Sequence, residues 1–389
     1  MIPRLLEKTI ITELSAPKNK LLLIYGPRQS GKTTLLTSLK NRLSPTKSVR
    51  YYNCDLESDF VSLNTRALSK LQEITRNVDI LLIDEAQRLD NPGLTLKIIY
   101  DNIPTVRVIA TGSSSFQLKN KLSDALTGRY WSYYLYPISF SEIVSYLFTN
   151  VPTDQQPNRV RELLDQFQLY GFYPEVLTQN DVKNKQLLLN NIKENYLFKD
   201  ALSFQHIRYS QALVNLCQAL AYQIGSEVNE QELSKRIKID RKTVISYLDI
   251  LEQSFIITRV YPYSQNPRRE IGRNYKVYFL DLGIRNALIG DFNSLNVRQD
   301  IGAVWENFII TERIKKLINS PKLHSYYFWR SYSGAEVDWI EKPYNLPMQA
   351  YEIKLSQSKL SKGAYIFSQE YKVPVEIINK DSYYLNLTS

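Results

Sequence analysis

Short apolar runs divide the first third of the chain into segments of strand length. Such runs occupy residues 21–25, 80–83 and 106–110, and residues 49–53 allow one more strand between the first two. Strands that are apolar at successive positions are typical of a parallel sheet that is covered on both faces. The pattern therefore predicts an α/β domain with a parallel sheet over residues 1–142.

Helical spacing replaces these runs in the middle of the chain. From about residue 143 to 205 the sequence is rich in leucine and tyrosine, and Val160, Leu164 and Phe167 recur at intervals of three to four residues. Apolar residues at this interval lie on one face of a helix. We expect a helical lid over residues 143–205.

A helix–turn–helix pattern follows the predicted lid. Acidic residues open one predicted helix near Glu230, and Asp240 can cap a second helix that extends to Glu252. An apolar strand comes directly after the second helix. The sequence therefore predicts a winged helix over residues 206–265.

The second helix of this pair begins with side chains suited to DNA. Arg241, Lys242 and Thr243 occupy its first turn, which is the part of a recognition helix that meets DNA. A winged helix can equally pack against its own chain or bind a protein. The sequence leaves both alternatives open.

The C-terminal part of the chain predicts a helix, three strands, a second helix and a final strand. The first helix covers residues 302–318, and the three strands follow at residues 325–329, 335–340 and 349–355. This alternation of helices and strands differs from the helical middle of the chain. We expect a separate α/β domain over residues 266–389.

Composition limits the class of protein without choosing a function. A chain of 389 residues suggests about two to four domains, and 43% hydrophobic and 23% charged residues are ordinary for a globular protein. No apolar run approaches the ~20 residues of a membrane span, and charges interrupt the N-terminal segment, so we expect a cytoplasmic protein with no membrane partner. Cys54 and Cys217 lie far apart, as do His206 and His324, which predicts reduced thiols and no zinc site. The net charge of +10 favours a polyanionic partner.

The clearest chemistry lies at residues 26–33, which read Gly-Pro-Arg-Gln-Ser-Gly-Lys-Thr. This is the pattern of a phosphate-binding P-loop, and it stands between a predicted strand and a predicted helix, as that motif requires. Its glycines let backbone N–H groups point at one phosphate, and the helix N-terminus adds partial positive charge. Lys32 is predicted to reach the outer phosphates of ATP, and the Thr33 hydroxyl is predicted to bind Mg²⁺. The residues expected to contact the nucleotide are Gly26, Pro27, Arg28, Gln29, Ser30, Gly31, Lys32, Thr33 and Thr34.

Two acidic residues follow the second apolar run, at the strand end where ligands bind in a parallel sheet. Asp84 is predicted to complete the magnesium shell with Thr33, and Glu85 is predicted to orient and polarise the attacking water. After the third run, Ser113 is a candidate catalytic residue that contacts the γ-phosphate or this water. A serine-rich turn that caps the next helix is an equal alternative.

Arg129 precedes an aromatic alternation over residues 130–136, which predicts the strand that closes the sheet. It is a candidate to stabilise charge on the transferred phosphoryl group, either within its own chain or across a subunit boundary in a homo-oligomer. A structural ion pair is the competing interpretation.

Together these motifs resemble those of a large group of prokaryotic AAA-type ATP-binding proteins. The motifs are GPRQSGKTTL at residues 26–35, LLIDEAQ at 81–87, ATGSSS at 110–115, LTGR at 126–129 and YPISFSE at 136–142. The resemblance covers nearly the whole chain, since members of the group usually carry a C-terminal domain of unknown function. It implies an AAA+-like ATPase core that uses ATP and Mg²⁺.

A second set of residues resembles the PD-(D/E)xK motif of the restriction-endonuclease-like fold. Glu352 and Lys354 share one face of a predicted strand, and Asp338 would converge with them from a neighbouring strand. The resemblance implies a second metal site on these carboxylates and on Glu306, with Lys354 as a catalytic residue rather than a ligand. However, Val337 replaces the proline of the motif, and a Glu-x-Lys pair on a strand is also a common charge pair.

The sequence thus predicts an ATPase that associates with DNA through a winged helix and a nuclease-like domain. ATP and Mg²⁺ are the expected cofactors, DNA is the expected macromolecular partner, and a homo-oligomer is a further candidate assembly. The alternative is a nucleotide-dependent protein-interaction switch whose nuclease-like domain is catalytically inactive.

Overall fold

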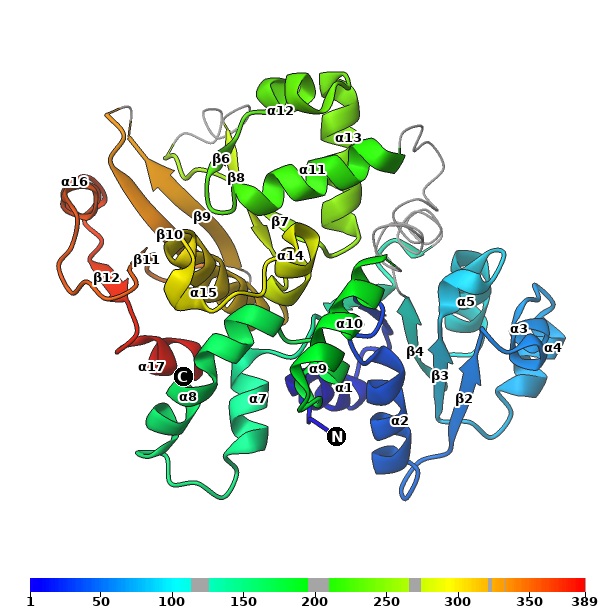
Figure 1. Ribbon diagram of the computed structural model, residues 1–389. Coiled ribbons are helices and arrows are strands. Elements are labelled where there is room, and N and C mark those ends of the chain that lie inside the picture. Colours follow the sequence, from blue (N-terminus) through cyan, green and yellow to red (C-terminus); the bar gives the residue numbers. More distant parts are fainter. Residues whose placement is uncertain (113–125, 195–209, 266–273, 321–323, 332, 389) are drawn as a thin grey trace. The chain divides into compact units, whose positions relative to one another are not determined.

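Two compact units, Met1–Ile138 and Ser139–Ser389, make up the protein in the computed structural model (Figure 1). The predicted domain boundary after residue 142 lies close to the boundary between these units. The three segments that were predicted as separate domains after residue 142 belong instead to one unit. The structure describes residues 1–112, 126–194, 210–265, 274–320, 324–331 and 333–388.

The described part of the first unit contains a five-stranded sheet. Its strands are β1 (Leu21–Tyr25), β2 (Val49–Asn53), β3 (Ile80–Asp84), β4 (Arg107–Gly112) and β5 (Tyr130–Tyr134). The order in the sheet is β2-β3-β4-β1-β5, and every neighbouring pair is parallel. The predicted parallel sheet is therefore confirmed, and β5 forms its edge beside β1.

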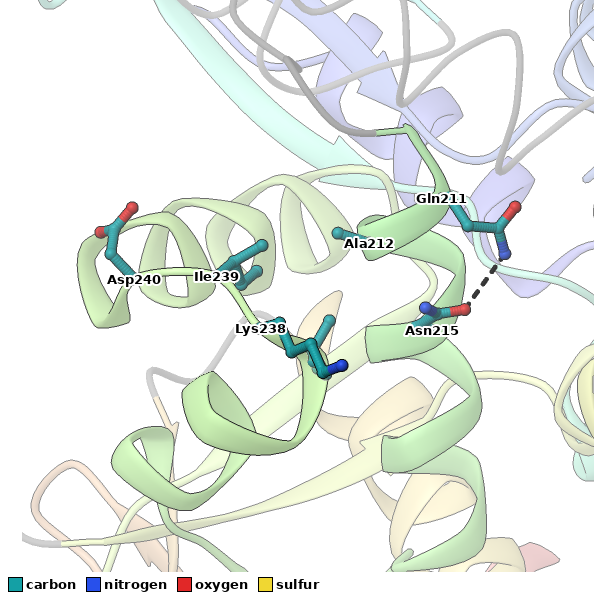
Figure 2. A pocket seen from close by; sticks show the side chains of 7 residues that line it. Gln211, Ala212, Asn215, Lys238, Ile239 and Asp240 are labelled. Carbon is teal, nitrogen blue, oxygen red and sulfur yellow. Dashed lines mark hydrogen bonds between the residues drawn. The ribbon is translucent and has the colours of Figure 1, made fainter.

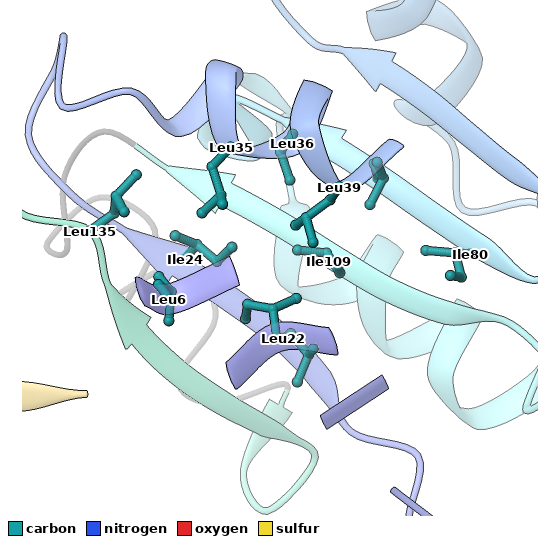
Figure 3. Packing of buried hydrophobic residues seen from close by; sticks show 11 residues of the cluster. Leu6, Leu22, Ile24, Leu35, Leu36, Leu39, Ile80, Ile109 and Leu135 are labelled. Carbon is teal, nitrogen blue, oxygen red and sulfur yellow. The ribbon is translucent and has the colours of Figure 1, made fainter. Parts of the chain in front are cut away.

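Helices α1 and α2 bury apolar side chains against this sheet. The helices of the unit are α1 (Leu5–Leu14), α2 (Lys32–Leu43), α3 (Glu57–Leu63), α4 (Leu68–Ile74) and α5 (Pro92–Asn102), with the short 3-10 helix η1 (Ala86–Arg88) after β3. Figure 3 shows the core side chains Leu6, Leu22, Ile24, Leu35, Leu36, Leu39, Ile80, Ile109 and Leu135. Their burial orients α2, which begins inside the predicted P-loop.

Helices fill the first part of the second unit. They are α7 (Phe140–Leu147), α8 (Gln156–Tyr170), α9 (Pro174–Leu177), α10 (Val182–Lys193) and α11 (Ser210–Tyr222). Helices α8, α10 and α11 all pack against α14 (Leu282–Ile289), which comes from much later in the chain. The side chain of Asn286 in α14 donates to the carbonyls of Gln168 and Leu169 at 3.0 and 2.9 Å. The helices predicted as a separate lid are therefore part of the second unit's core, because α14 covers them.

A three-stranded antiparallel sheet follows in the described chain, in the order β6-β8-β7. Its strands are β6 (Glu227–Val228), β7 (Ile257–Val260) and β8 (Tyr275–Phe279). Helices α12 (Glu230–Ile237) and α13 (Arg241–Gln253) lie between β6 and β7 in the chain and pack against each other. The predicted helix–turn–helix with a following strand is confirmed. The sheet extends past the predicted domain end at residue 265, because β8 is its central strand.

The described C-terminal sheet has four strands in the order β12-β11-β10-β9. Strands β9 (His324–Arg330), β10 (Glu336–Pro343) and β11 (Gln349–Ile353) are antiparallel neighbours, and β12 (Val375–Ile378) is parallel to β11. Helix α15 (Ile301–Ile318) precedes β9, α16 (Lys362–Tyr371) precedes β12, and α17 (Tyr383–Thr388) follows it. The predicted order of helix, three strands, helix and strand is confirmed.

Backbone hydrogen bonds join the two sheets of the second unit. The Tyr263 N–H donates to the carbonyl of Phe328 at 2.6 Å, and the Phe328 N–H donates to the carbonyl of Tyr261 at 3.1 Å. This pairing explains why the predicted winged-helix and C-terminal segments belong to one compact unit. Across the described parts of both units, no helix combines the length and apolar character needed to cross a membrane.

Candidate functional site

The predicted P-loop connects β1 to α2 at the C-terminal edge of the parallel sheet. Gln29 and Gly31 have φ angles of 60° and 96°, in the left-handed region, which lets the loop curl back on itself. Gly26 lies against the backbone of Leu135, because a Cβ built at residue 26 would be 2.2 Å from the Leu135 carbonyl oxygen. A side chain at residue 26 would therefore displace the loop or the segment after β5.

The Lys32 side chain lies along this loop. Its Nζ donates to the carbonyls of Gly26 and Pro27 at 3.0 and 2.9 Å, and the residue is 4% exposed. Lys32 is also the first residue of α2, where backbone N–H groups have no partner within the helix. An ammonium group and a helix N-terminus at the same loop form a binding site for an anion.

Ser30 and Arg4 complete the P-loop. The Ser30 hydroxyl is buried, and no hydrogen-bond partner for it lies among the described residues. A buried hydroxyl without a partner is costly, and a phosphate oxygen would satisfy it. Arg4 donates to the carbonyls of Ser30 and Tyr136 at 2.8 and 2.6 Å. The loop therefore fits a phosphate group, and Arg4, which belongs to no motif, supports it from the N-terminal segment.

The carboxylate of Asp84 gathers hydroxyl groups at the same sheet edge. Thr33 donates to one carboxylate oxygen at 2.6 Å, and Tyr51 donates to that oxygen at 3.1 Å. Thr111 donates to the other oxygen. Burial, reinforced by the Asp84 carboxylate, raises the pKa of Tyr51, so the phenol remains a proton donor. The oxygens of Thr33 and Asp84 are ligands of the kind that Mg²⁺ prefers, and the structure brings them together as predicted.

Glu85 stands directly beside this carboxylate. Its φ of 52° is uncommon for a residue other than glycine. Its backbone N–H donates to the Thr111 hydroxyl at 3.1 Å, and its own carboxylate accepts from Gln87. Residues with such backbone conformations concentrate at functional sites. Glu85 therefore lies beside the Thr33–Asp84 pair, and its water-orienting role stays a prediction.

Two hydroxyl groups of this site carried weaker sequence signals. Thr111 is the next-to-last residue of β4 and lies two residues before the predicted Ser113, which is outside the described residues. Tyr51 lies on β2, and no sequence pattern indicates which strand neighbours β3. The register of β2 and β3 aligns Tyr51 with Leu82, two residues before Asp84. Only the sheet order thus reveals the contact of Tyr51 with Asp84.

Arg129 lies at the opposite edge of the sheet from the P-loop. Its carbonyl accepts from the Leu21 N–H at 3.0 Å at the start of β1, whereas the P-loop follows the end of β1. The length of that strand, about 16 Å at ~3.3 Å per residue, separates the two positions. The guanidinium donates twice to Asp101, at 2.8 and 3.3 Å. The predicted contact with a phosphoryl group of the same chain is therefore corrected to a structural ion pair, and a role across a subunit boundary stays a prediction.

Helix α13 begins with the residues predicted to meet DNA, and two of these have partners within the chain. Arg241 pairs with Glu230 at 2.8 Å, and Thr243 donates to Asp240, the residue that caps the helix. We use the term basic face for the other exposed cations of α12, α13 and their turn, which are Lys235, Arg236, Lys238 and Lys242.

A hollow lies beside this basic face, between α11 and the turn from α12 to α13 (Figure 2). Gln211 and Asn215 line it from α11, and the Gln211 side chain donates to that of Asn215 at 3.1 Å. Lys238 and Asp240 line it from the turn with opposite charges. This mixture does not select a particular ligand class, and we assign none.

The predicted C-terminal Glu-x-Lys pair is an ion pair in the structure. Lys354 and Glu352 are 3.0 Å apart, and the second carboxylate oxygen of Glu352 accepts the Ser361 N–H at 2.8 Å. Glu352 is 2% exposed. Each of its carboxylate oxygens therefore has a partner inside the protein, Lys354 for one and Ser361 for the other. This arrangement matches the charge pair that the sequence left open as an alternative.

Asp338 lies on β10 at a bulge, where the register with β9 shifts between Val337 and Ile340. A bulge changes the face to which a side chain points. The Asp338 carboxylate accepts the Ile353 N–H at 2.7 Å. Burial raises the pKa of Asp338 to about 7, and the neighbouring carboxylate of Glu306 contributes to the increase.

A metal role for the predicted set of Glu306, Asp338 and Glu352 stays a prediction. In the structure, the Glu306 carboxylate forms an ion pair with the ammonium group of Lys276 at 3.2 Å. Within the described parts of the chain, no three His, Cys, Asp or Glu side chains are placed to hold one metal ion. The register of β10 and β11 nevertheless places Asp338 opposite Glu352, one position from the Trp339–Tyr351 pair. Glu306 is also close enough to contribute to the raised pKa of Asp338.

Family models divide the chain in a way that agrees with its two units. Residues 18–144 match a model described as an AAA domain. Residues 161–295 and 301–384 match two models that are each described as a domain of unknown function (DUF8612 and DUF4143). The expected C-terminal domain of unknown function is confirmed, whereas its nuclease-like character stays a prediction.

Similar proteins occur in distant organisms. An uncharacterized protein of Mycobacterium bovis is 23% identical over 371 residues, covering 91% of this chain and 78% of the relative. One of Haemophilus influenzae is 26% identical over 284 residues, covering 69% of this chain and 68% of the relative. One of Methanocaldococcus jannaschii is 23% identical over 351 residues, covering 84% and 73%.

Among solved structures, AMPPCP-bound DnaA from Aquifex aeolicus matches with 19% identity and a TM-score of 0.31, covering 64% of this chain and 87% of that chain. A TM-score of this size does not establish a shared fold. The family model and the P-loop geometry therefore carry the assignment. The first unit therefore carries a P-loop and is similar to the AAA domain that the family model describes.

Proposed function

We propose that this protein binds ATP with Mg²⁺ and hydrolyses it at the P-loop edge of the first unit. The observation that carries the proposal is the Thr33–Asp84 contact of 2.6 Å beside the buried ammonium group of Lys32. The residues proposed to bind phosphate, to hold the metal ion and to orient water thus lie at one sheet edge. Phosphoryl transfer requires these three functions close together.

Each of these residues has a separate role. Lys32 and the loop N–H groups bind the outer phosphates, and the ammonium offsets negative charge on the transferred group. Thr33 and Asp84 would hold Mg²⁺, which supplies further charge neutralisation on the phosphates when it is bound. Glu85 accepts a hydrogen bond from the attacking water and orients it. Tyr51 and Thr111 hold the carboxylate of Asp84 in place.

Replacement of Lys32 tests the assignment. We expect Lys32→Ala to abolish ATP turnover, measured as phosphate release. Lys47→Ala is the matched control, since Lys47 is exposed beyond the far end of α2, and it should keep the wild-type rate. A folded Lys32→Ala protein that hydrolyses ATP at the wild-type rate would sink the assignment.

We infer further that the ATPase cycle is coupled to DNA association through the α12–α13 pair, which we interpret as a winged helix, and through the nuclease-like C-terminal domain. The basic face of Lys235, Arg236, Lys238 and Lys242 supports this inference, as does the net charge of +10. Cations exposed on a helix–turn–helix pair can neutralise backbone phosphates.

A salt titration of duplex DNA binding tests the basic face. Fluorescence anisotropy should show that Lys235→Ala/Lys242→Ala weakens binding and lowers the slope of log K against log salt by about one per lost phosphate contact. The control is Lys183→Ala, an exposed lysine on α10. Wild-type binding that ignores salt, or no binding at low salt, would reject DNA as the partner.

A second candidate is a nucleotide-dependent protein-interaction switch with an inactive C-terminal domain. One observation favours it: Arg241 and Thr243, at the start of α13, are already engaged by Glu230 and Asp240. Failure of the DNA titration together with intact ATP turnover would favour this candidate.

A further inference from the structure

Lys276 reaches the C-terminal carboxylates from a strand outside the C-terminal sheet. It belongs to β8 of the three-stranded sheet, and its Nζ is 3.2 Å from Glu306 of α15. The same Nζ pairs with Glu336 of β10. Lys276 is 3% exposed, so its ammonium group lies inside the protein between two carboxylates.

Neighbouring groups hold this ammonium in its charged form. Burial alone lowers the pKa of Lys276, but the carboxylates of Glu306 and Glu336, together with Asp338, raise it above the ordinary value. The Nζ also lies 5.4 Å from the centre of the Phe328 ring, within range of a cation–π interaction. The cluster therefore contains a permanent buried cation at neutral pH.

Two of these carboxylates also accept a hydrogen bond from the protein. Tyr278 donates to Glu306 at 2.6 Å, on the oxygen that also faces Lys276. Asp338 accepts the Ile353 N–H at 2.7 Å. Glu352, which would complete a metal site, pairs with Lys354 instead.

We propose that Lys276 is the resident cation of this cluster, and that Glu306, Glu336 and Asp338 consequently bind no divalent metal ion. A divalent ion between these carboxylates would lie beside a buried ammonium group, and the repulsion would be poorly screened because water is excluded. The C-terminal domain therefore does not cleave phosphodiesters at these residues. Its contact with β8 makes it a support for the sheet that carries the α12–α13 pair. This proposal does not depend on the ATPase assignment.

Direct measurement of Mn²⁺ binding tests the proposal. Full-length protein without nucleotide is titrated with Mn²⁺ at pH 8, and the free ion is followed by electron paramagnetic resonance. All variants carry Asp84→Asn, so that the P-loop carboxylate contributes to none of them. We expect this parent and its Asp338→Asn derivative to bind Mn²⁺ equally, because Asp338 holds no metal in either protein.

Removal of the ammonium group gives the complementary test. Lys276→Met keeps an unbranched side chain without the charge, and we expect it to bind about one additional Mn²⁺ per chain through the vacated carboxylates. Adding Asp338→Asn to that variant should abolish the gain.

Two results would overturn the proposal. One is Mn²⁺ binding, or Mn²⁺-dependent nicking of supercoiled DNA, that the parent shows and Asp338→Asn loses. The other is a folded Lys276→Met variant that gains no ion. If Lys276→Met does not fold, the comparison of the parent with Asp338→Asn still decides the question.

Discussion

Two carboxylate sites of this protein use similar acidic residues but surround them with different partners. At the P-loop edge, Asp84 is held by the hydroxyl groups of Thr33, Tyr51 and Thr111. In the C-terminal domain, Glu306 is held by the ammonium group of Lys276. The comparison teaches that the charge of the partner, and not the carboxylate itself, decides whether a site can accept a metal ion.

The physical difference lies in what a metal would have to displace. A threonine hydroxyl carries no net charge, and its oxygen can turn from donating to a carboxylate to binding a cation. A buried ammonium group is fixed by its ion pairs, and its removal leaves buried negative charge without a partner. The oxygens at the P-loop edge therefore suit Mg²⁺, whereas the C-terminal cluster already holds a cation.

The largest expected effect concerns the water-orienting residue of the P-loop edge. Glu85→Gln should lower the rate of ATP hydrolysis by about 10³-fold, since a positioned base contributes on the order of 10²–10⁴. Binding of a fluorescent ATP analogue should change little, because Glu85 does not belong to the phosphate-binding loop. Single-turnover hydrolysis measures the first quantity, and a rate within a few-fold of wild type would contradict the role of Glu85.

Loss of the internal cation should destabilise the second unit. We expect Lys276→Met to lower the free energy of unfolding by about 3 kcal/mol, because it leaves the partly buried carboxylates of Glu306 and Glu336 without their partner. Urea denaturation at pH 8 measures the loss, and added Mn²⁺ should recover part of it. The control Lys354→Met removes an ion pair whose lysine is 33% exposed, so its cost should be smaller. Equal losses of unfolding free energy in Lys276→Met and Lys354→Met would contradict the special role of the Lys276 ammonium group.

The stability should also depend on pH through Asp338. Its pKa rises from 3.8 to about 7 on folding, so the folded state binds a proton that the unfolded state releases. The stabilisation from this proton is present below about pH 4 and is lost as the pH rises to about 7. Glu306, Lys276 and Lys354 all influence this titration.

Substitution of this carboxyl group isolates its contribution. Relative to wild type, Asp338→Asn should gain stability on the order of 2 kcal/mol between pH 5 and pH 8, because the amide does not titrate. Urea denaturation at both pH values measures the gain. Parallel stability profiles for the two proteins would show that Asp338 titrates in its ordinary range.

The smallest effect should come from the hydrogen bond between Tyr51 and Asp84. Tyr51→Phe removes one donor to the carboxylate, which is worth about 1 kcal/mol. We therefore expect the Mg²⁺ concentration for half-maximal ATP turnover to rise about fivefold, with ATP binding in the absence of Mg²⁺ unchanged. Tyr52→Phe, the adjacent tyrosine of β2, is the control. If the Mg²⁺ concentration for half-maximal turnover is unchanged, Tyr51 does not contribute to the magnesium site.

Local motifs were predictable because their geometry lies within a few consecutive residues. The P-loop from Gly26 to Thr33 needs one strand, one turn and one helix, and all three follow from adjacent sequence. Asp84 was predictable for a similar reason, since it ends a buried strand of the same parallel sheet. The prediction for Arg129 was wrong for the same chain, because Arg129 precedes a strand of this parallel sheet. Residues that precede a strand lie at the opposite sheet edge from residues that follow a strand, such as the P-loop.

The C-terminal domain shows the same limit over longer distances. The order of its helices and strands follows from the sequence pattern, but the pattern contains neither the bulge near Asp338 nor the approach of Lys276 from β8. Likewise, the helical spacing of the predicted lid was recognisable, while α14, the helix that packs against α8 and α10, was not. Contacts between distant segments depend on packing that no local pattern records.

The sequence by itself determined the phosphate-binding loop, the parallel sheet around it and the order of elements in the second unit, because spacing and polarity within short segments dictate these features. Only the tertiary structure decided which charge meets which carboxylate. Asp84 meets neutral hydroxyl groups, and Glu306 meets the ammonium group of Lys276 from a strand 30 residues earlier. Burial then strengthens each of these pairings, because charges that are shielded from water interact more strongly with their neighbours.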